Sequence, residues 1–288
     1  MDTTELLKRV RKIEIKSKGL SAQLFSGEYK SAFKGRGMSF SEVREYQPGD
    51  DVRSIDWNVT ARTNNAHIKV YEEERELTVM LLVDISASEN FGTQKQLKRE
   101  LIAELCATIA FSATQNKDKV GVIFFTDKIE KFIPPQKGKS HILLIIRELL
   151  NIAPLSKGTN VSVVIKYFAS VIKKRATTFI ISDFESPNFD DELKIAAKKH
   201  TFIALNISDQ REKELPNIGL IPMLDNETGT QRWVDTSNAN VRKQYAAQAQ
   251  VQQDKLNSTF KRYGVPCAQL NTLDDYVISL RNVFKQKV

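Results

Sequence analysis

The sequence predicts an α/β protein with a doubly wound, mostly parallel sheet, preceded by a small β-rich N-terminal extension. Short apolar runs bounded by charged or polar residues are typical of strands that are buried on both faces. Segments with helical spacing of apolar residues lie between them, so strands and helices alternate along the chain. This alternation indicates a parallel sheet covered by helices. The clearest predicted strands are residues 77–83, 119–125, 177–182 and 201–206. Residues 128–133 are expected to form a short antiparallel edge strand and residues 231–235 a further strand.

Composition is that of an ordinary globular protein: 288 residues, 41% hydrophobic, 27% charged, with a formal net charge of +8. This length allows one large domain or two smaller ones. We place the boundary before the first predicted strand, so residues 1–76 form an N-terminal helix and β-rich extension and residues 77–288 the α/β domain. Residues 1–36 hold nine Lys and Arg against four Asp and Glu, so this arm carries +5 of the net charge.

Neither an export signal nor a membrane-spanning run is recognisable in the sequence. The two cysteines, Cys106 and Cys267, lie far apart, and we expect them to be reduced thiols in the core. We therefore expect a cytoplasmic protein. There is no Lys or Arg block of the kind that forms a nucleic-acid-binding tail, so no nucleic-acid partner is expected.

An acid and two hydroxyls follow the first predicted strand: Asp84, Ser86 and Ser88. In an open α/β sheet, ligands bind outside the carboxyl ends of the strands. Oxygen ligands suit a hard cation such as Mg²⁺ or Mn²⁺. The alternative interpretation is that these residues cap the next helix, because Asp and Ser are favoured at that position.

This D-x-S-x-S spelling resembles the metal-ion-dependent adhesion site (MIDAS) of von Willebrand factor A domains. The resemblance implies a von Willebrand factor A-like, Rossmann-like fold and two further metal ligands: a Thr before a helix and an Asp that ends another strand. Both are present in the expected order, as Thr159 before the helical run 161–172 and as Asp183 after the apolar run 177–182. The predicted metal ligands are Asp84, Ser86, Ser88, Thr159 and Asp183.

Residues 35–76 contain a dense set of charges around apolar residues and a Pro48-Gly49 pair that predicts a type II turn. One interpretation is a recognition loop. The other, which we favour, is a polar network that holds a small β-rich subdomain on the main sheet, because dense ion pairs are often structural. This second interpretation expects Trp57 to be at least half buried. The residues concerned are Asp50, Asp51, Arg53, Asp56, Trp57 and Arg62.

The same region contains the sequence motif G-x-G-x-x-F-x-x-V-R-E-Y-x-P-G-D-D-V-R-x-I-D-W-x-x-x-A-R-T. The predicted strand that ends in D-x-S-x-S follows it. This combination resembles the bacterial "domain of unknown function 58" family, which is described as von Willebrand factor A-like. The resemblance implies a metal-binding protein-interaction protein without established catalytic activity, working with a MoxR-type AAA+ ATPase. One residue departs from the family: Glu89 stands where members usually have Met. It could reach the metal and regulate the site, or point into solvent.

Among enzymes, the serious alternative is a metal-dependent phosphoesterase or nuclease that uses Asp84, Asp127, Asp183 and Glu185. The sequence contains no phosphate-binding G-x-x-x-x-G-K-[ST] loop and no histidine cluster suited to zinc. Two of the three residues near the first strand end are neutral serines, which favours a single ion with an open position. The expected function is therefore non-catalytic: a Mg-bearing adaptor that binds an acidic residue of a partner.

Overall fold

The computed structural model describes residues 39–72, 77–91, 97–224 and 230–285, together with residues 8, 11–14 and 17. The chain divides into two compact units, Lys34–Leu77 and the remainder, Met1–Phe33 with Thr78–Val288. We call them the small unit and the main unit and describe each by itself. The predicted N-terminal helix lies mostly outside the described residues. Lys8 and residues 11–14 are helical, and Glu14 forms an ion pair of 2.7 Å with Lys139.

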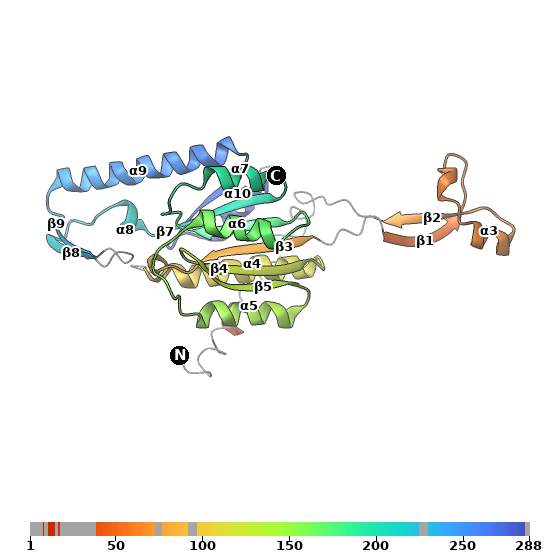
Figure 1. The fold of residues 1–288 in the computed structure, drawn as a ribbon, viewed down its shortest axis with the longest axis horizontal. Coiled ribbons are helices and arrows are strands. Elements are labelled where there is room, and N and C mark those ends of the chain that lie inside the picture. Colours follow the sequence, from red (N-terminus) through yellow and green to blue (C-terminus); the bar gives the residue numbers. More distant parts are fainter. Residues whose placement is uncertain are drawn as a thin grey trace. The chain divides into compact units, whose positions relative to one another are not determined.

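A six-stranded sheet forms the centre of the main unit (Figure 1), in the order β10-β7-β6-β3-β4-β5. All neighbouring strands are parallel except β4 and β5, which are antiparallel. This confirms the predicted fold class, including the antiparallel edge strand. The strands are β3 (Thr78–Asp84), β4 (Lys119–Phe125), β5 (Ile129–Gln136), β6 (Thr177–Ser182), β7 (Thr201–Ser208) and β10 (Cys267–Asn271).

Helices cover both faces of this sheet (Figure 1), which is why its central strands are apolar throughout. One layer contains α4 (Lys98–Gln115), α5 (Lys139–Asn151) and α10 (Tyr276–Lys285). The other contains α6 (Val161–Val171), α7 (Asp190–Ala197) and the C-terminal end of α9 (Ala239–Arg262). Alternate residues of β3 face the two layers: Met80 and Leu82 pack in the core formed with α6, α7 and α9.

Both cysteines are free thiols, with Cys106 buried and Cys267 partly buried. Burial raises the pKa of Cys267 to about 12 and that of Cys106 also far above its ordinary value. Thiols of this kind are unreactive core residues.

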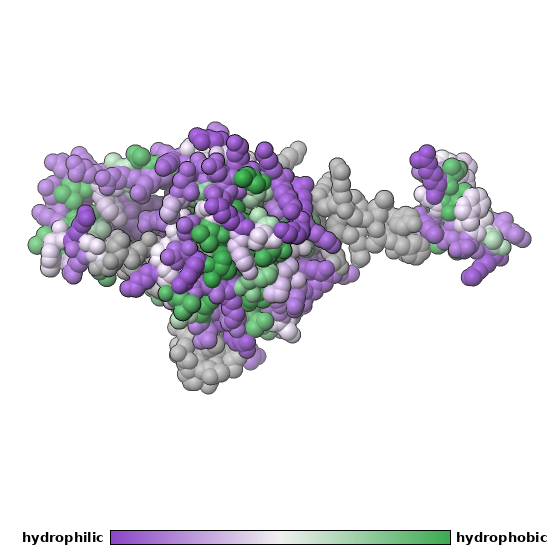
Figure 2. All heavy atoms as spheres, viewed as in Figure 1, coloured by the Kyte–Doolittle hydropathy of each residue, from purple (hydrophilic) through white to green (hydrophobic). Residues whose placement is uncertain are grey.

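A separate hairpin follows β7 and the short helix α8 (Gln210–Lys213): β8 (Leu220–Leu224) pairs antiparallel with β9 (Gln231–Asp235). The sequence predicted the second of these strands but not the first. Figure 2 shows mostly hydrophilic residues on the visible face of the main unit. Among the described residues, no helix has the length and apolar character needed to cross a membrane.

In the small unit, β1 (Ser39–Glu45) pairs antiparallel with β2 (His67–Glu72), and the connection forms the 3-10 helix η1 (Val52–Ser54) and α3 (Trp57–Thr63). The predicted turn at Pro48-Gly49 is present. The Asp50 N–H donates to the carbonyl of Gln47 over 3.0 Å, and Gly49 has φ +109°, which only glycine adopts without strain.

The charged residues of this unit mostly satisfy local backbone groups. Asp51 accepts from Arg53 N, and Asp56 caps α3 by accepting from Asn58 N. Asp50 binds Arg44 through two hydrogen bonds of 2.8 Å. Arg53 and Arg62 form no ion pair within the described part of the chain.

The prediction that Trp57 is at least half buried is wrong, because its side chain is 70% exposed. Trp57 is the first residue of α3, directly after the capping Asp56. Among the described apolar residues of the small unit, Ile68 is the one that is buried. Small units bury a smaller fraction of their surface than large domains do, and here the Trp57 indole stays exposed.

Candidate metal centre

Two predicted ligands come from neighbouring strands. Asp84 is the last residue of β3, and Asp183 directly follows β6, which pairs with β3. From β3 the chain builds β4 and β5 on one side, whereas β6, β7 and β10 lie on the other. The carboxyl ends of β3 and β6 therefore flank the point where the strand order reverses, the usual ligand position in such sheets.

The Asp84 side chain is fully buried and bonded on both oxygens. Its Oδ1 accepts from Ser86 N over 2.9 Å, and its Oδ2 accepts from the hydroxyl of Ser182 over 2.6 Å. Burial and the nearby Asp183 carboxylate raise the pKa of Asp84 to about 7, although these hydrogen bonds act in the opposite direction. Burial and the neighbouring negative charge thus both disfavour the charged form of Asp84.

Three loops meet beside Asp84. Ser86 is buried, and its hydroxyl lies 3.0 Å from that of Ser88. Ala87 N donates to the carbonyl of Lys157 over 3.1 Å, which joins the serine loop to the loop that carries Thr159. Thr159 itself is 5% exposed. The predicted ligands Ser86 and Thr159 therefore lie in hydrogen-bonded loops at the same edge of the sheet.

Glu89 does not point into solvent, because it is 1% exposed. Neither of its carboxylate oxygens has a hydrogen-bond partner within the described part of the chain. Burial raises the pKa of Glu89 well above its ordinary value; the Lys98 ammonium opposes this, and the Asp183 and Asp84 carboxylates add to it. Burying a carboxylate without a hydrogen-bond partner is costly.

A group of three acids has the spacing of a cation site. Asp84, Glu89 and Asp183 each place one carboxylate oxygen so that the three atoms lie within 4.8 Å of one another. Together with the serine hydroxyls, they form an oxygen-only set of the kind that suits Mg²⁺ or Mn²⁺. The unpartnered Glu89 oxygens show that these residues fit such an ion.

Sequence reasoning missed Lys98, which is fully buried in the first turn of α4. Its ammonium lies 2.9 Å from Asp183 Oδ2 and 2.8 Å from Glu212 Oε1. Burial alone would lower the pKa of Lys98, but the carboxylates of Glu89, Asp183 and Glu212 outweigh it and raise the pKa. One signal in the sequence is a cation in the first turn of a helix, where the helix dipole disfavours positive charge.

Backbone strain accompanies the Asp183 loop. Phe184 has φ +59°, a left-handed conformation that aromatic residues rarely adopt. The Phe184 ring packs against the Phe260 ring with centroids 5.0 Å apart. The backbone N–H of Phe184 donates to the Ser182 hydroxyl over 2.9 Å. Such strained residues cluster at functional sites.

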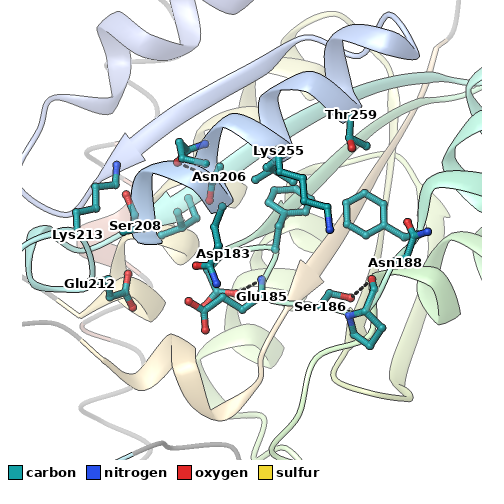
Figure 3. A pocket seen from close by; sticks show the side chains of 18 of the residues that line it. Asp183, Glu185, Ser186, Asn188, Asn206, Ser208, Glu212, Lys213, Lys255 and Thr259 are labelled. Carbon is teal, nitrogen blue, oxygen red and sulfur yellow. Dashed lines mark hydrogen bonds between the residues drawn. The ribbon is translucent and has the colours of Figure 1, made fainter. Parts of the chain in front are cut away.

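A groove opens beside the acids (Figure 3), with a cavity volume of about 290 Å³. Figure 3 shows Asp183 beside Glu185, with Glu212 on the α8 side and Lys255 reaching in from α9. Glu185 N donates to Asp183 Oδ1 over 3.2 Å. Amide side chains, including Asn188 and Gln253, contribute further to its lining. The groove could therefore accept a polar chain next to the candidate metal position.

The remaining sequence candidates lie elsewhere. Asp50, Asp51, Arg53, Asp56, Trp57 and Arg62 belong to the small unit. Asp127, one of the acids of the hydrolase alternative, is exposed in the turn between β4 and β5.

The parallel sheet with helices on both faces and a polar site at its carboxyl edge is compatible with a von Willebrand factor A-like domain. A sequence model of the family described as "Protein of unknown function DUF58" matches residues 42–255. The chain belongs to this family.

Several known proteins are similar to this chain. The uncharacterized protein Rv1480 of Mycobacterium tuberculosis is 30% identical over 283 residues, covering 97% of this chain and 89% of the relative. YeaD of Bacillus subtilis is 29% identical over 109 residues, 38% of this chain and 25% of YeaD. An aerotolerance-related membrane protein from Bacteroides fragilis is structurally similar, with a TM-score of 0.49, 17% identity, and coverage of 73% of this chain and 98% of the other.

Proposed function

We propose that this chain is a non-catalytic, metal-dependent interaction protein that binds a carboxylate of a partner through one Mg²⁺ or Mn²⁺. The ligands of the ion would be Asp84, Ser86, Ser88, Thr159 and Asp183. The observation that carries the proposal is the buried Glu89 carboxylate, which has no hydrogen-bond partner in the described residues and lies beside Asp84 and Asp183. The ion would supply a positive charge with an exchangeable position.

Glu89 has a regulatory role in this proposal. Its carboxylate is close enough to Asp84 and Asp183 to occupy the exchangeable position in cis. A partner carboxylate would then have to displace it. The groove next to Asp183 offers room for the residues that flank the partner's acid.

The family resemblance supports the identity of the partner that we propose, a MoxR-type AAA+ ATPase or a protein presented by it. The cytoplasmic location expected from the sequence is part of this proposal. A hydrolase is less well supported, because Asp127 is exposed and Lys98 occupies the space between Asp183 and Glu212.

Affinity capture from the native cell, in Mg²⁺ and in EDTA, tests the proposal. Wild type should capture its partner in Mg²⁺ and lose it in EDTA, and Asp84→Ala should not capture it in either buffer. Asp127→Ala removes an exposed acid at the same end of the sheet and should behave like wild type. Undiminished capture by wild type in EDTA, or capture by Asp84→Ala as strong as that by wild type in Mg²⁺, would contradict the proposal.

A further inference from the structure

Lys98 presents an unusual combination of burial and charge. A lysine is rarely fully buried, because its ammonium loses hydration that the protein must replace. Here two carboxylates replace the lost hydration of the ammonium: Asp183 in the loop after β6 and Glu212 in α8. The charge of Glu89 also stabilises the Lys98 ammonium, in addition to these two acids.

Charge balance suggests what this arrangement does. Four carboxylates surround the site, those of Asp84, Glu89, Asp183 and Glu212, and Lys98 forms ion pairs with two of them. A lysine ammonium is a compact point charge that stays attached to the chain, and here two carboxylates hold it in place. It therefore takes the place that a second divalent ion would need between Asp183 and Glu212.

We propose that Lys98 is a tethered second cation of the site, which limits the site to one divalent ion and weakens the binding of that ion. This inference rests on the proposed metal-dependent function. It also explains why Asp183 is shared: one oxygen, Oδ2, is held by Lys98, and the other, Oδ1, accepts from Glu185 N. Lys98 acts on the ion through these carboxylates and is thus a positioning residue.

The test compares wild type with Lys98→Met, which keeps the length of the side chain and removes its charge. Calorimetric titration with Mg²⁺ should show one ion per wild-type chain. Lys98→Met should bind Mg²⁺ about tenfold more tightly or more, because a unit charge a few ångströms away has been removed. Lys131→Met is the matched control, since Lys131 pairs with Glu148 in an exposed ion pair of 2.7 Å, and it should bind Mg²⁺ like wild type.

Thermal melting gives a readout that does not need the metal. In EDTA, Lys98→Met should melt roughly 10 °C below wild type, because breaking a buried pair leaves uncompensated charge. Adding Glu89→Gln to Lys98→Met should recover part of this loss, because it removes one of the repelling carboxylates. If Lys98→Met does not fold, the double variant Lys98→Met/Glu89→Gln is compared with the single variant Glu89→Gln, and the same differences in Mg²⁺ affinity and melting temperature are expected.

The outcomes separate this inference from the proposed function. If Lys98→Met binds Mg²⁺ no more tightly than Lys131→Met, Lys98 does not limit the ion and the inference is overturned. If neither wild type nor any variant binds Mg²⁺, the proposed metal dependence fails. The melting temperatures in EDTA then test the electrostatic role of Lys98 alone. Recovery by Glu89→Gln then keeps Lys98 as the cation of the acidic cluster, and lack of recovery overturns that role too.

Discussion

At the scale of single residues, Glu89 is the side chain whose burial most needs a ligand to explain it. Its pKa is raised well above the ordinary value, chiefly by burial, so the folded protein is destabilised by its charged form. Asp84 shows the same tendency, with a pKa of about 7. Two acids that resist ionisation in adjacent positions are typical of a functional site.

Glu89→Gln should therefore stabilise the metal-free protein by about 1 kcal/mol or more, because a neutral amide replaces a buried carboxylate without a partner. Thermal melting in EDTA measures this change. The same variant should capture the partner more strongly in Mg²⁺, since the cis carboxylate no longer competes. A variant that melts below wild type and captures less partner would assign Glu89 a purely structural role.

His200 provides a pH-dependent contribution far from the site. It is 2% exposed, and its ring lies against Phe168 with centroids 4.6 Å apart. Burial, with the charges of Lys199 and Arg175, lowers the pKa of His200 to about 4 from 6.5. The unfolded chain takes up a proton below pH 6.5 that the folded protein refuses, so this contribution is complete above pH 6.5 and is lost as the pH falls towards 4.

His200→Phe should remove this part of the pH dependence. An aromatic side chain without a titrating group should keep the contacts with Phe168 and Phe202. Melting temperatures measured between pH 7 and pH 4 should fall less for the variant than for wild type. Parallel pH profiles for the two proteins would show that His200 titrates normally in the fold.

At the scale of elements, α3 shows how tertiary context overrides a sequence pattern. Trp57 is a large aromatic residue of the kind expected in a core, but it is the exposed first residue of α3. The residue before it, the capping Asp56, is buried instead. Val52 on η1 is 63% exposed as well. These exposures remove the reason for treating this stretch as a packed core and leave the recognition interpretation open.

Trp57→Ala should accordingly cost little stability, within about 0.5 kcal/mol, as is usual for exposed positions. Chemical denaturation of the full chain measures this. If the variant melts like wild type but loses the captured partner, the small unit carries a recognition surface. A loss of about 3 kcal/mol or more would mean that the indole is buried, in contradiction to its exposure in the structure.

The strands of the main sheet could be predicted because their apolar runs follow directly from burial on both faces. The positions of Asp84 and Asp183 followed from the strand ends. Lys98 and Glu212 could not be placed in this way, since their meeting depends on α4 and α8 packing near the same edge. The hairpin strand β8 was not predicted, and unlike the strands of the main sheet it leaves apolar side chains exposed, including Leu220 at 63% and Leu224 at 60%.

At the scale of the whole molecule, the doubly wound topology brings the loops after β3 and β6, together with α8, to one edge of the sheet. The core strands are apolar and need no ion to pack, so the protein should fold without metal. The acids at the edge, by contrast, are compensated incompletely by Lys98. The apolar core thus provides folding without the ion, whereas the acids and Lys98 at the edge determine how the ion is bound.

The most direct test of the metal-dependent function is a calorimetric titration of Mg²⁺ into wild type, Asp84→Asn and Asp127→Asn. We expect wild type and Asp127→Asn to bind one ion per chain, because Asp127 is exposed outside the cluster. Asp84→Asn should bind none at millimolar Mg²⁺ while remaining folded. Absence of binding to wild type, or equal binding by Asp84→Asn, would contradict the account.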